Sequence, residues 1–159
     1  MHSKGMNTFG GGFSLIELVS VMVILAAITA LAAPRFVHYD ATVPAQADLL
    51  GRIIRHAQAL AMSQGRPLTV DVQSASNYVI TDGATPTPST IRDPSGQLQA
   101  FSLQHDVTLS GADLEFDSLG RPISGGNLVT TTQSWTLSRG SNTATVSVQP
   151  VTGFVSVTP

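Results

Sequence analysis

An apolar segment near the N-terminus constrains this chain more than any other feature. Residues 18–33 are apolar except for Ser20 and Thr29. A helix over residues 13–36 would be about 36 Å long at roughly 1.5 Å per residue, which is enough to cross a hydrocarbon core of about 30 Å. Glu17 lies at the start of this segment. A carboxylate within a membrane-spanning helix costs at least about 2.5 kcal/mol, so we expect Glu17 to have a function.

A short leader, residues 1–12, precedes the apolar segment. It carries Lys4 and ends in three glycines, and Gly12 is followed by Phe13, Ser-Leu-Ile and Glu17. A Gly-Phe pair alone would be weak, but Gly, Phe and Glu at these offsets, opening an apolar helix, form a specific signal. This stretch resembles the processing site of type IV pilins and type II secretion pseudopilins. The resemblance extends to Pro34, where many pilins have a helix-kinking proline.

The resemblance implies a processing and assembly scheme. A prepilin peptidase would cut between Gly12 and Phe13, the new amine of Phe13 would be N-methylated, and Glu17 would be needed for assembly. The physical chemistry is consistent with this scheme, because an unpaired charge in a low-dielectric setting is costly and a paired charge is much less so. In a filament, Glu17 of one subunit would neutralise the Phe13 amine of its neighbour and set their register.

Two other interpretations of the same segment remain open. The first is an ordinary secretory signal, because Ala-Leu-Ala at residues 30–32 fits the small-x-small cleavage pattern; it implies a secreted periplasmic protein such as an enzyme. The second is a plain single-span anchor in which Glu17 reaches the membrane interface. The secretory interpretation places Glu17 inside the apolar region of the signal and leaves the Gly12–Phe13 junction accidental.

Composition limits what the rest of the chain does. Charged residues make up 11% of the 159 residues, with four histidines and a net charge of −2. This balance gives no basic patch of the kind that binds duplex nucleic acid. The chain has no cysteine. Many major pilins close a C-terminal loop with a disulfide, so its absence here favours a minor pilin or a pseudopilin.

We expect four consecutive segments: the cleaved leader 1–12, a transmembrane assembly helix 13–36, the exposed half of the same helix 37–65, and an antiparallel β globular domain 66–159. Residues 45–63 have apolar positions three and four apart, which predicts an amphipathic helix. The predicted stripe consists of Leu49, Ile53, Ala57, Leu60 and Ala61, widened by Leu50 and Ile54. Gly65 and the following proline should end this helix. Pro44 indicates either a helix irregularity or a short linker.

From residue 68 the apolar period changes to two, which indicates strands. Residues 68–72 and 77–81 should form a hairpin. Further strands are expected at residues 98–103, 107–109, 114–117, 135–138, 143–149 and 154–157. Between the hairpin and these strands, residues 82–96 hold three prolines and two glycines. This composition predicts a long irregular loop that is either disordered or a contact surface.

A turn at residues 116–122, FDSLGRP, resembles an element of the GspH/FimT class of minor pilins and pseudopilins. Asp117 is expected to accept hydrogen bonds from local amides, and Gly120 to supply a positive φ. Asp117 and Arg121 are placed to pair across the turn. A structural role is therefore expected for these residues.

The chain offers little for catalysis. It lacks a cysteine nucleophile, a zinc-binding HExxH, a Gly-x-Ser-x-Gly elbow and a phosphate-binding Walker loop. Asp113, Glu115 and Asp117 alternate, so they would share one strand face and offer acid–base chemistry or calcium binding; a solvated strand edge is the simpler interpretation. The remaining candidates are scattered histidines: His38, His56 and His105. We expect no enzyme activity, no cofactor and no metal.

The sequence thus predicts an α+β fold of the pilin type, with a long N-terminal helix, its first half transmembrane, packed on a C-terminal antiparallel sheet. The resemblance implies a minor subunit, at the tip or priming assembly, of a type IV or MSHA-type pilus. Its partners would be other pilins or pseudopilins, the prepilin peptidase, the assembly platform and the inner membrane, with the C-terminal domain periplasmic. The alternatives are a type II secretion pseudopilin, a DNA- or surface-binding protein, or a secreted enzyme.

Overall fold

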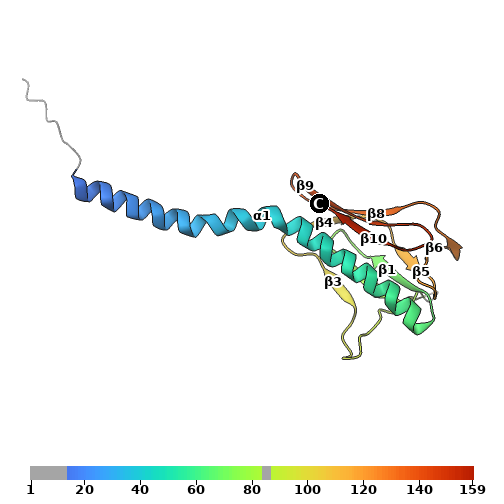
Figure 1. Ribbon diagram of the computed structural model, residues 1–159. Helices are drawn as coiled ribbons and strands as arrows, with labels where there is room; N and C mark the ends of the chain where they lie inside the picture. The colour runs from blue at the N-terminus through green and yellow to red at the C-terminus, as the bar shows by residue number, and fades with distance from the viewer. Residues whose placement is uncertain (1–13, 84–86) are drawn as a thin grey trace, which may run out of the picture. The chain divides into compact units, whose positions relative to one another are not determined.

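The computed structural model describes residues 14–83 and 87–159, except for the side chains of residues 30–40 (Figure 1). The chain divides into two compact units, residues 1–39 and 40–159. The predicted processing residues Gly12 and Phe13 lie outside the described part. Pro34 lies in a helical stretch whose side chains are not described.

One helix, α1 (Leu15–Gln64), contains 50 residues and contributes to both units. It continues through Pro44, so the alternative of a short linker over residues 37–44 is wrong. Val43 and Leu50 are buried on either side of the proline, and this packing outweighs the missing N–H donor. The helix ends as predicted: Gly65 has a φ of 62°, and the N–H of Arg66 donates to the carbonyl of Ala61 at 3.3 Å.

The face of α1 that enters the core contains Leu50, Ile54, Ala57 and Ala61 of the predicted stripe, and Leu60 packs against the core. Leu49 is 41% exposed and Ile53 is only partly buried. The buried stripe also extends toward the N-terminus and follows spacings of four and three: Val43, Ala47, Leu50, Ile54, Ala57 and Ala61. Gly51, also buried, explains part of this choice, because a Cβ there would lie 2.9 Å from Cγ2 of Val157. The small residues face the strands because they let the backbone approach closely.

The strands form two antiparallel sheets rather than the single sheet that the sequence suggested. The first sheet has six strands in the order β3-β2-β1-β5-β6-β7. Their bounds are β1 (Leu68–Val72), β2 (Asn77–Thr81), β3 (Ala100–Ser102), β5 (Leu114–Phe116), β6 (Pro122–Ser124) and β7 (Asn127–Leu128). The predicted β1–β2 hairpin is confirmed, with Val70 opposite Ile80.

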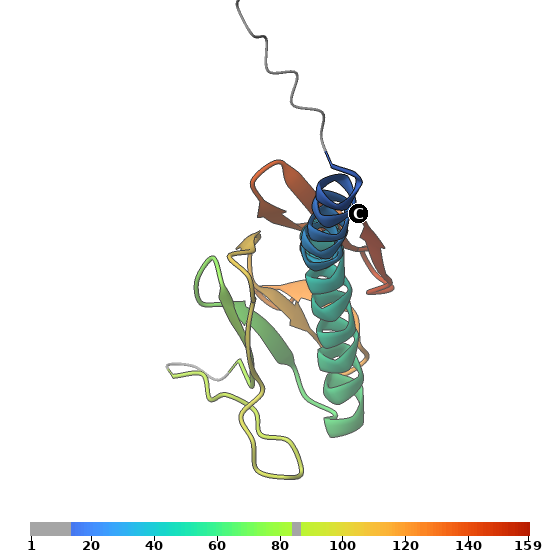
Figure 2. The same cartoon turned by 90° about the vertical axis from the view of Figure 1, so that its left-hand side faces the viewer.

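The second sheet has four strands in the order β10-β9-β8-β4. Their bounds are β4 (Thr108–Ser110), β8 (Gln133–Arg139), β9 (Asn142–Val148) and β10 (Val155–Thr158). Along β9, Ala144, Val146 and Val148 are buried and alternate with more exposed residues, as the period-two pattern predicted. In Figure 2 the second half of α1 lies across the strands of the globular unit.

One hydrophobic cluster joins the two sheets and the helix. It contains Leu50 and Ile54 of α1, Phe116 of the first sheet, and Trp135 and Leu137 of the second. The α+β class and the helix-on-sheet arrangement are therefore as predicted.

The segment 82–96 was expected to be a long irregular loop, and its described residues are more ordered than that. Ile91 is buried in the core, and its N–H donates to the carbonyl of Ile80 at 2.8 Å. Isolated β-bridges join Thr90 to Thr81 and Arg92 to Leu98. Residues 91–99, called here the 91–99 hairpin, thus run beside β2, because burial of one apolar side chain outweighs the proline and glycine content.

Candidate functional site

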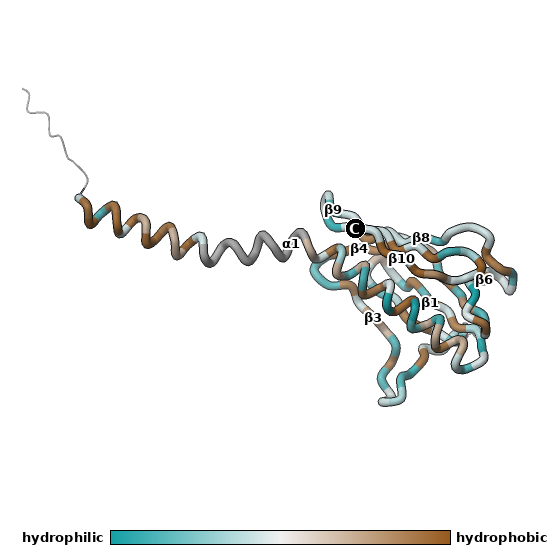
Figure 3. Tube along the Cα trace, viewed as in Figure 1, coloured by the Kyte–Doolittle hydropathy of each residue, from teal (hydrophilic) through white to brown (hydrophobic). Residues whose placement is uncertain are grey.

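The first half of α1 presents apolar side chains in every direction. At the start of this helix, the N–H groups of Glu17 and Leu18 donate hydrogen bonds to the carbonyl of Ser14, at 3.0 and 3.2 Å. In Figure 3 this part of the helix is strongly hydrophobic. The large exposed apolar residues are Leu15, Ile16, Leu18, Val19, Val21, Met22, Val23, Ile24, Leu25 and Ile28. A helix that is apolar on all sides is normally covered by protein or lipid, so this surface requires a partner.

Glu17 is the one charged residue between Leu15 and Thr29. It is exposed in the first turn of α1 and forms no ion pair with any described residue. Its carboxylate interacts favourably with the positive end of the helix dipole. The charge is therefore available to a cation from outside the described residues.

The two hydroxyl side chains of this apolar segment are satisfied within the helix. The Oγ of Ser20 donates to the carbonyl of Ile16 at 2.8 Å, and the Oγ1 of Thr29 donates to the carbonyl of Leu25 at 2.9 Å. These bonds leave neither hydroxyl proton unpaired in an apolar surrounding.

Over the described residues, no helix is both long and apolar enough to cross a membrane.

The turn between β5 and β6 has the predicted structure. Oδ1 of Asp117 accepts from the N–H groups of Leu119 and Arg121, both at 2.9 Å, and Oδ2 lies 2.7 Å from the guanidinium of Arg121. Gly120 has a φ of 75°. Burial raises the pKa of Asp117, but the hydrogen bonds from Arg121 and Leu119 outweigh burial and bring that pKa below its usual value. Asp117 is thus a turn residue with no free oxygen for catalysis.

Gln58 of α1 connects this turn to the β9–β10 turn, a role that the sequence did not reveal. Its Nε2 donates to the carbonyl of Gly120 at 2.7 Å and to the carbonyl of Thr152 at 3.2 Å. Gly153 of the β9–β10 turn lies close to the β5–β6 turn, since a Cβ on Gly153 would lie 2.8 Å from the carbonyl oxygen of Gly120.

Around Gln58, exposed apolar side chains gather on the two turns. Leu119 and Phe154 are each 65% exposed, and Val151 and Met62 are about half exposed. Val151 has a φ of 64°, which is rare for a β-branched residue. A large apolar residue within a Pro-Val-Thr-Gly-Phe turn is a signal that sequence analysis could have used for such a patch.

Two of the three alternating carboxylates are brought together: Asp113 and Glu115 line one surface pocket of about 250 Å³, which Asp117 does not line. Oδ1 of Asp113 accepts from the N–H of Val72 at 2.9 Å, and Glu115 lies within β5 opposite Thr69. Asp117 is instead held within the β5–β6 turn. In the part of the chain that the structure describes, no group of three or more His, Asp or Glu side chains could hold a metal ion.

Of the predicted histidines, His56 and His105 have described side chains and lie on different parts of the fold. His56 is exposed on α1 and lines a surface pocket. His105 lies in the turn after β3 with a φ of 60°. The side chain of His38 is not described.

Comparison with solved structures identifies the fold. Two crystal structures of the type IV minor pilin FimU from Pseudomonas aeruginosa (strain PAO1) resemble the chain, with TM-scores of 0.56 and 0.52. The first is 14% identical and covers 77% of this chain and 92% of the solved chain. The second is 15% identical and covers 73% and 92%. The chain has a type IV pilin-like fold. No protein-family model and no curated protein sequence matches it.

Proposed function

We propose that this chain is a minor pilin, a structural subunit that joins a type IV pilus or an MSHA-type pilus through the first half of α1. The observation that carries the proposal is the helix over residues 15–29, which is apolar on all sides and holds a single carboxylate. Its pilin-like globular unit supports the same role, because FimU is a type IV minor pilin. Burial of about ten apolar side chains against neighbouring helices or lipid would drive assembly.

The proposal assigns a role to each residue of the processing motif. Prepilin peptidase cleaves between Gly12 and Phe13, and the amine of Phe13 is then methylated. The segment 13–36 anchors the subunit in the inner membrane, with residues 40–159 in the periplasm, until the assembly platform moves it into the filament. There, Glu17 pairs with the Phe13 amine of a neighbouring pilin, and Pro34 bends the helix.

The proposed role is structural rather than catalytic. Asp117 and Arg121, the most strongly paired polar side chains, hold the β5–β6 turn together, and Gln58 fastens that turn to the helix. Their hydrogen-bonding groups are used within the fold. Such residues suit a rigid subunit that presents surfaces to its neighbours.

The first experiment is the intact mass and N-terminal sequence of the protein from membranes of its native host. A chain that starts at N-methylated Phe13 is expected. A chain that starts at Ala33 would contradict the proposal and support a secreted protein. An uncleaved chain would indicate a plain membrane anchor.

A second experiment separates membrane anchoring from assembly. The variant Glu17→Gln should be processed and inserted normally but should be absent from sheared filaments, because the neighbouring amine would lose its counter-charge. Glu115→Gln, which removes a carboxylate from the globular unit, is the matched control and should assemble. Normal incorporation of Glu17→Gln would refute the role of the carboxylate. The major subunit that co-purifies distinguishes a pilus from a type II secretion pseudopilus.

A further inference from the structure

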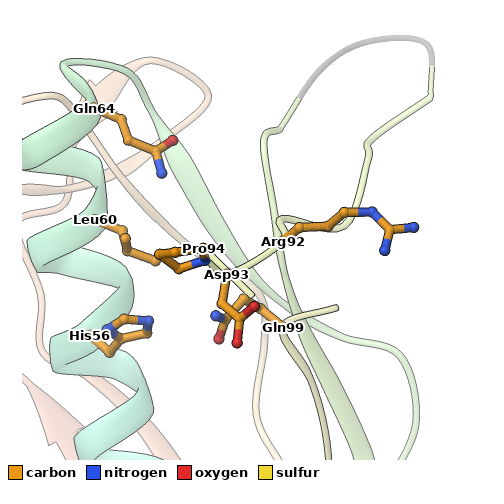
Figure 4. Close-up of a pocket in the computed structure, with 7 residues that line it drawn as sticks. All are labelled: His56, Leu60, Gln64, Arg92, Asp93, Pro94 and Gln99. Carbon is orange, nitrogen blue, oxygen red and sulfur yellow. The ribbon is translucent and has the colours of Figure 1, made fainter. Parts of the chain in front are cut away.

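A surface pocket lies between the second half of α1 and the 91–99 hairpin, and we call it the hairpin pocket (Figure 4). Its volume is about 270 Å³. It is lined by His56, Leu60, Gln64, Arg92, Asp93, Pro94 and Gln99. The three helix residues are four apart and therefore share one face of α1 over successive turns.

The pocket has an apolar centre and a polar side. Figure 4 shows the side chains of Leu60 and Pro94 pointing toward each other from the helix and the hairpin. Beside this pair, His56 of the helix faces the carboxylate of Asp93 and the amide of Gln99. A ligand here would meet apolar carbon on one side and hydrogen-bonding groups on the other.

Asp93 gives the pocket its charge. Its Oδ1 accepts three hydrogen bonds, from the N–H and Oγ of Ser95 at 2.9 and 2.7 Å and from the N–H of Gln97 at 2.9 Å. The hydroxyl of Ser95 and the backbone of Gln97 lower the pKa of Asp93, so its carboxylate is ionised at neutral pH. Its Oδ2 forms no ion pair with any side chain that the structure describes. One oxygen therefore fixes the turn, and the other is free to accept.

The neighbouring cation does not neutralise this carboxylate. Nη1 of Arg92 donates to the carbonyl of Gly96 at 2.7 Å, and Figure 4 shows its guanidinium turned away from His56 and Asp93. The charge of Asp93 is thus offered to a ligand, while the arginine next to it in sequence is held by the hairpin backbone.

The size of the pocket limits the ligand. Sites for drug-sized molecules measure about 300–1,000 Å³, so the hairpin pocket has room for about one long side chain. We propose that it binds an arginine side chain of another protein. The aliphatic stem would lie on Leu60 and Pro94, and the guanidinium would donate to Oδ2 of Asp93 and to the amide oxygen of Gln99. Arginine suits the site better than lysine, because its planar group has several donors and is more weakly hydrated.

The expected contribution is modest. An ion pair that is open to solvent changes an equilibrium by about twofold to fivefold. The pocket would therefore orient and select a protein partner rather than hold it alone. The proposal concerns only residues of the globular unit and does not depend on filament assembly.

The test uses the full-length, ¹⁵N-labelled chain in detergent micelles, titrated with Nα-acetyl-argininamide and followed by NMR. Saturable shifts are expected for amides of residues 56–64 and 91–99. The neutral isostere Nα-acetyl-citrullinamide should bind at least about twofold more weakly, and added salt should weaken only the arginine ligand. Equal shifts with both ligands, or arginine-induced shifts only elsewhere, would overturn the proposal.

Asp93→Asn is the informative variant, because the asparagine oxygen can still accept the three hydrogen bonds of the turn while the charge is lost. It should bind the arginine ligand about twofold to fivefold more weakly. The matched control is Asp106→Asn, which removes another exposed carboxylate and should bind as the parent does. Slow exchange of the Ser95 and Gln97 amides verifies that the turn persists. Unchanged binding by Asp93→Asn would also overturn the proposal.

Discussion

Replacing Gly111 with alanine places a methyl group against the indole ring of Trp135. The new Cβ would lie 2.7 Å from both Cγ and Nε1 of the ring and still closer to Cδ1. Carbon atoms pack at about 3.5–4.0 Å, so Cδ1 of the ring must move by at least about 1.5 Å. Trp135 is 2% exposed, and its Nε1 donates to the carbonyl of Ala112 at 2.8 Å. The movement required would break this hydrogen bond.

Two costs follow from that movement. Overpacking a core costs about 1–3 kcal/mol, and a buried donor without a partner costs about 1–3 kcal/mol. We expect Gly111→Ala to lower the free energy of unfolding by about 2–6 kcal/mol. Gly126→Ala is the control, because Gly126 has a φ of 80° and no atom near the new Cβ; it should lose only about 1–2 kcal/mol from backbone strain.

The assay is urea unfolding of the full chain in a mild detergent, followed by far-UV circular dichroism, because the Trp135→Phe variants lack the only tryptophan. Trp135→Phe is less stable by itself but has a smaller ring, so the double variant with Gly111→Ala should show a favourable coupling of about 1 kcal/mol or more. If Gly111→Ala is no less stable than Gly126→Ala, or if the two sites add without coupling, the steric explanation fails.

Three further predictions use the same unfolding assay. Gly51→Leu should cost about 1–3 kcal/mol by pushing α1 away from β10, whereas Gly51→Ala should cost far less, since a single β10 methyl group can shift. Gln58→Ala should cost about 1–3 kcal/mol and speed amide exchange in both turns that it joins, and unchanged exchange would contradict its bridging role. The lowered pKa of Asp117 stabilises the fold above its unfolded pKa of about 3.9. Wild type should therefore exceed Asp117→Asn in stability at pH 7 and lose that advantage as the pH falls through the folded pKa; a constant difference would contradict the ion pair.

Local signals in the sequence were sufficient for several parts of the fold. Alternation of apolar and polar residues in residues 68–81 predicted the β1–β2 hairpin, because successive side chains of a pleated strand point to opposite faces of the sheet. The Asp117–Arg121 turn was predictable for a similar reason: its donors and acceptors lie within four residues. Both features depend on neighbours in the chain.

Features that depend on distant partners were not predictable. The sequence did not show that the buried stripe of α1 leaves out Leu49 and adds Val43 and Ala47, because the fit of small residues against β10 helps decide which positions are buried. Gln58 reached carbonyls 62 and 94 residues away. Ile91 drew a proline-rich segment into the core through contacts with β2. Division of the strands into two sheets likewise follows from long-range pairing.

The proposed functional residues also fall into a group that local sequence identifies and a group that it does not. Gly12, Phe13 and Glu17 were recognised from a sequence motif, and their proposed contacts join different subunits. The hairpin pocket, in contrast, needs His56 and Asp93 to face each other from elements far apart in the chain. No spacing rule in the sequence announces that arrangement.

The contact between Arg55 and β10 has a consequence for synthesis. Nη2 of Arg55 donates to the carbonyl of Val155 at 3.0 Å, across 100 residues of sequence. At about 5–20 residues per second, the ribosome would add that length in roughly 5–20 s. Throughout this interval the apolar stripe of α1 lacks its last strand. A nascent chain of this design is therefore exposed to aggregation and to capture by chaperones until β10 emerges, and slowed translation of the last strands should lengthen that period.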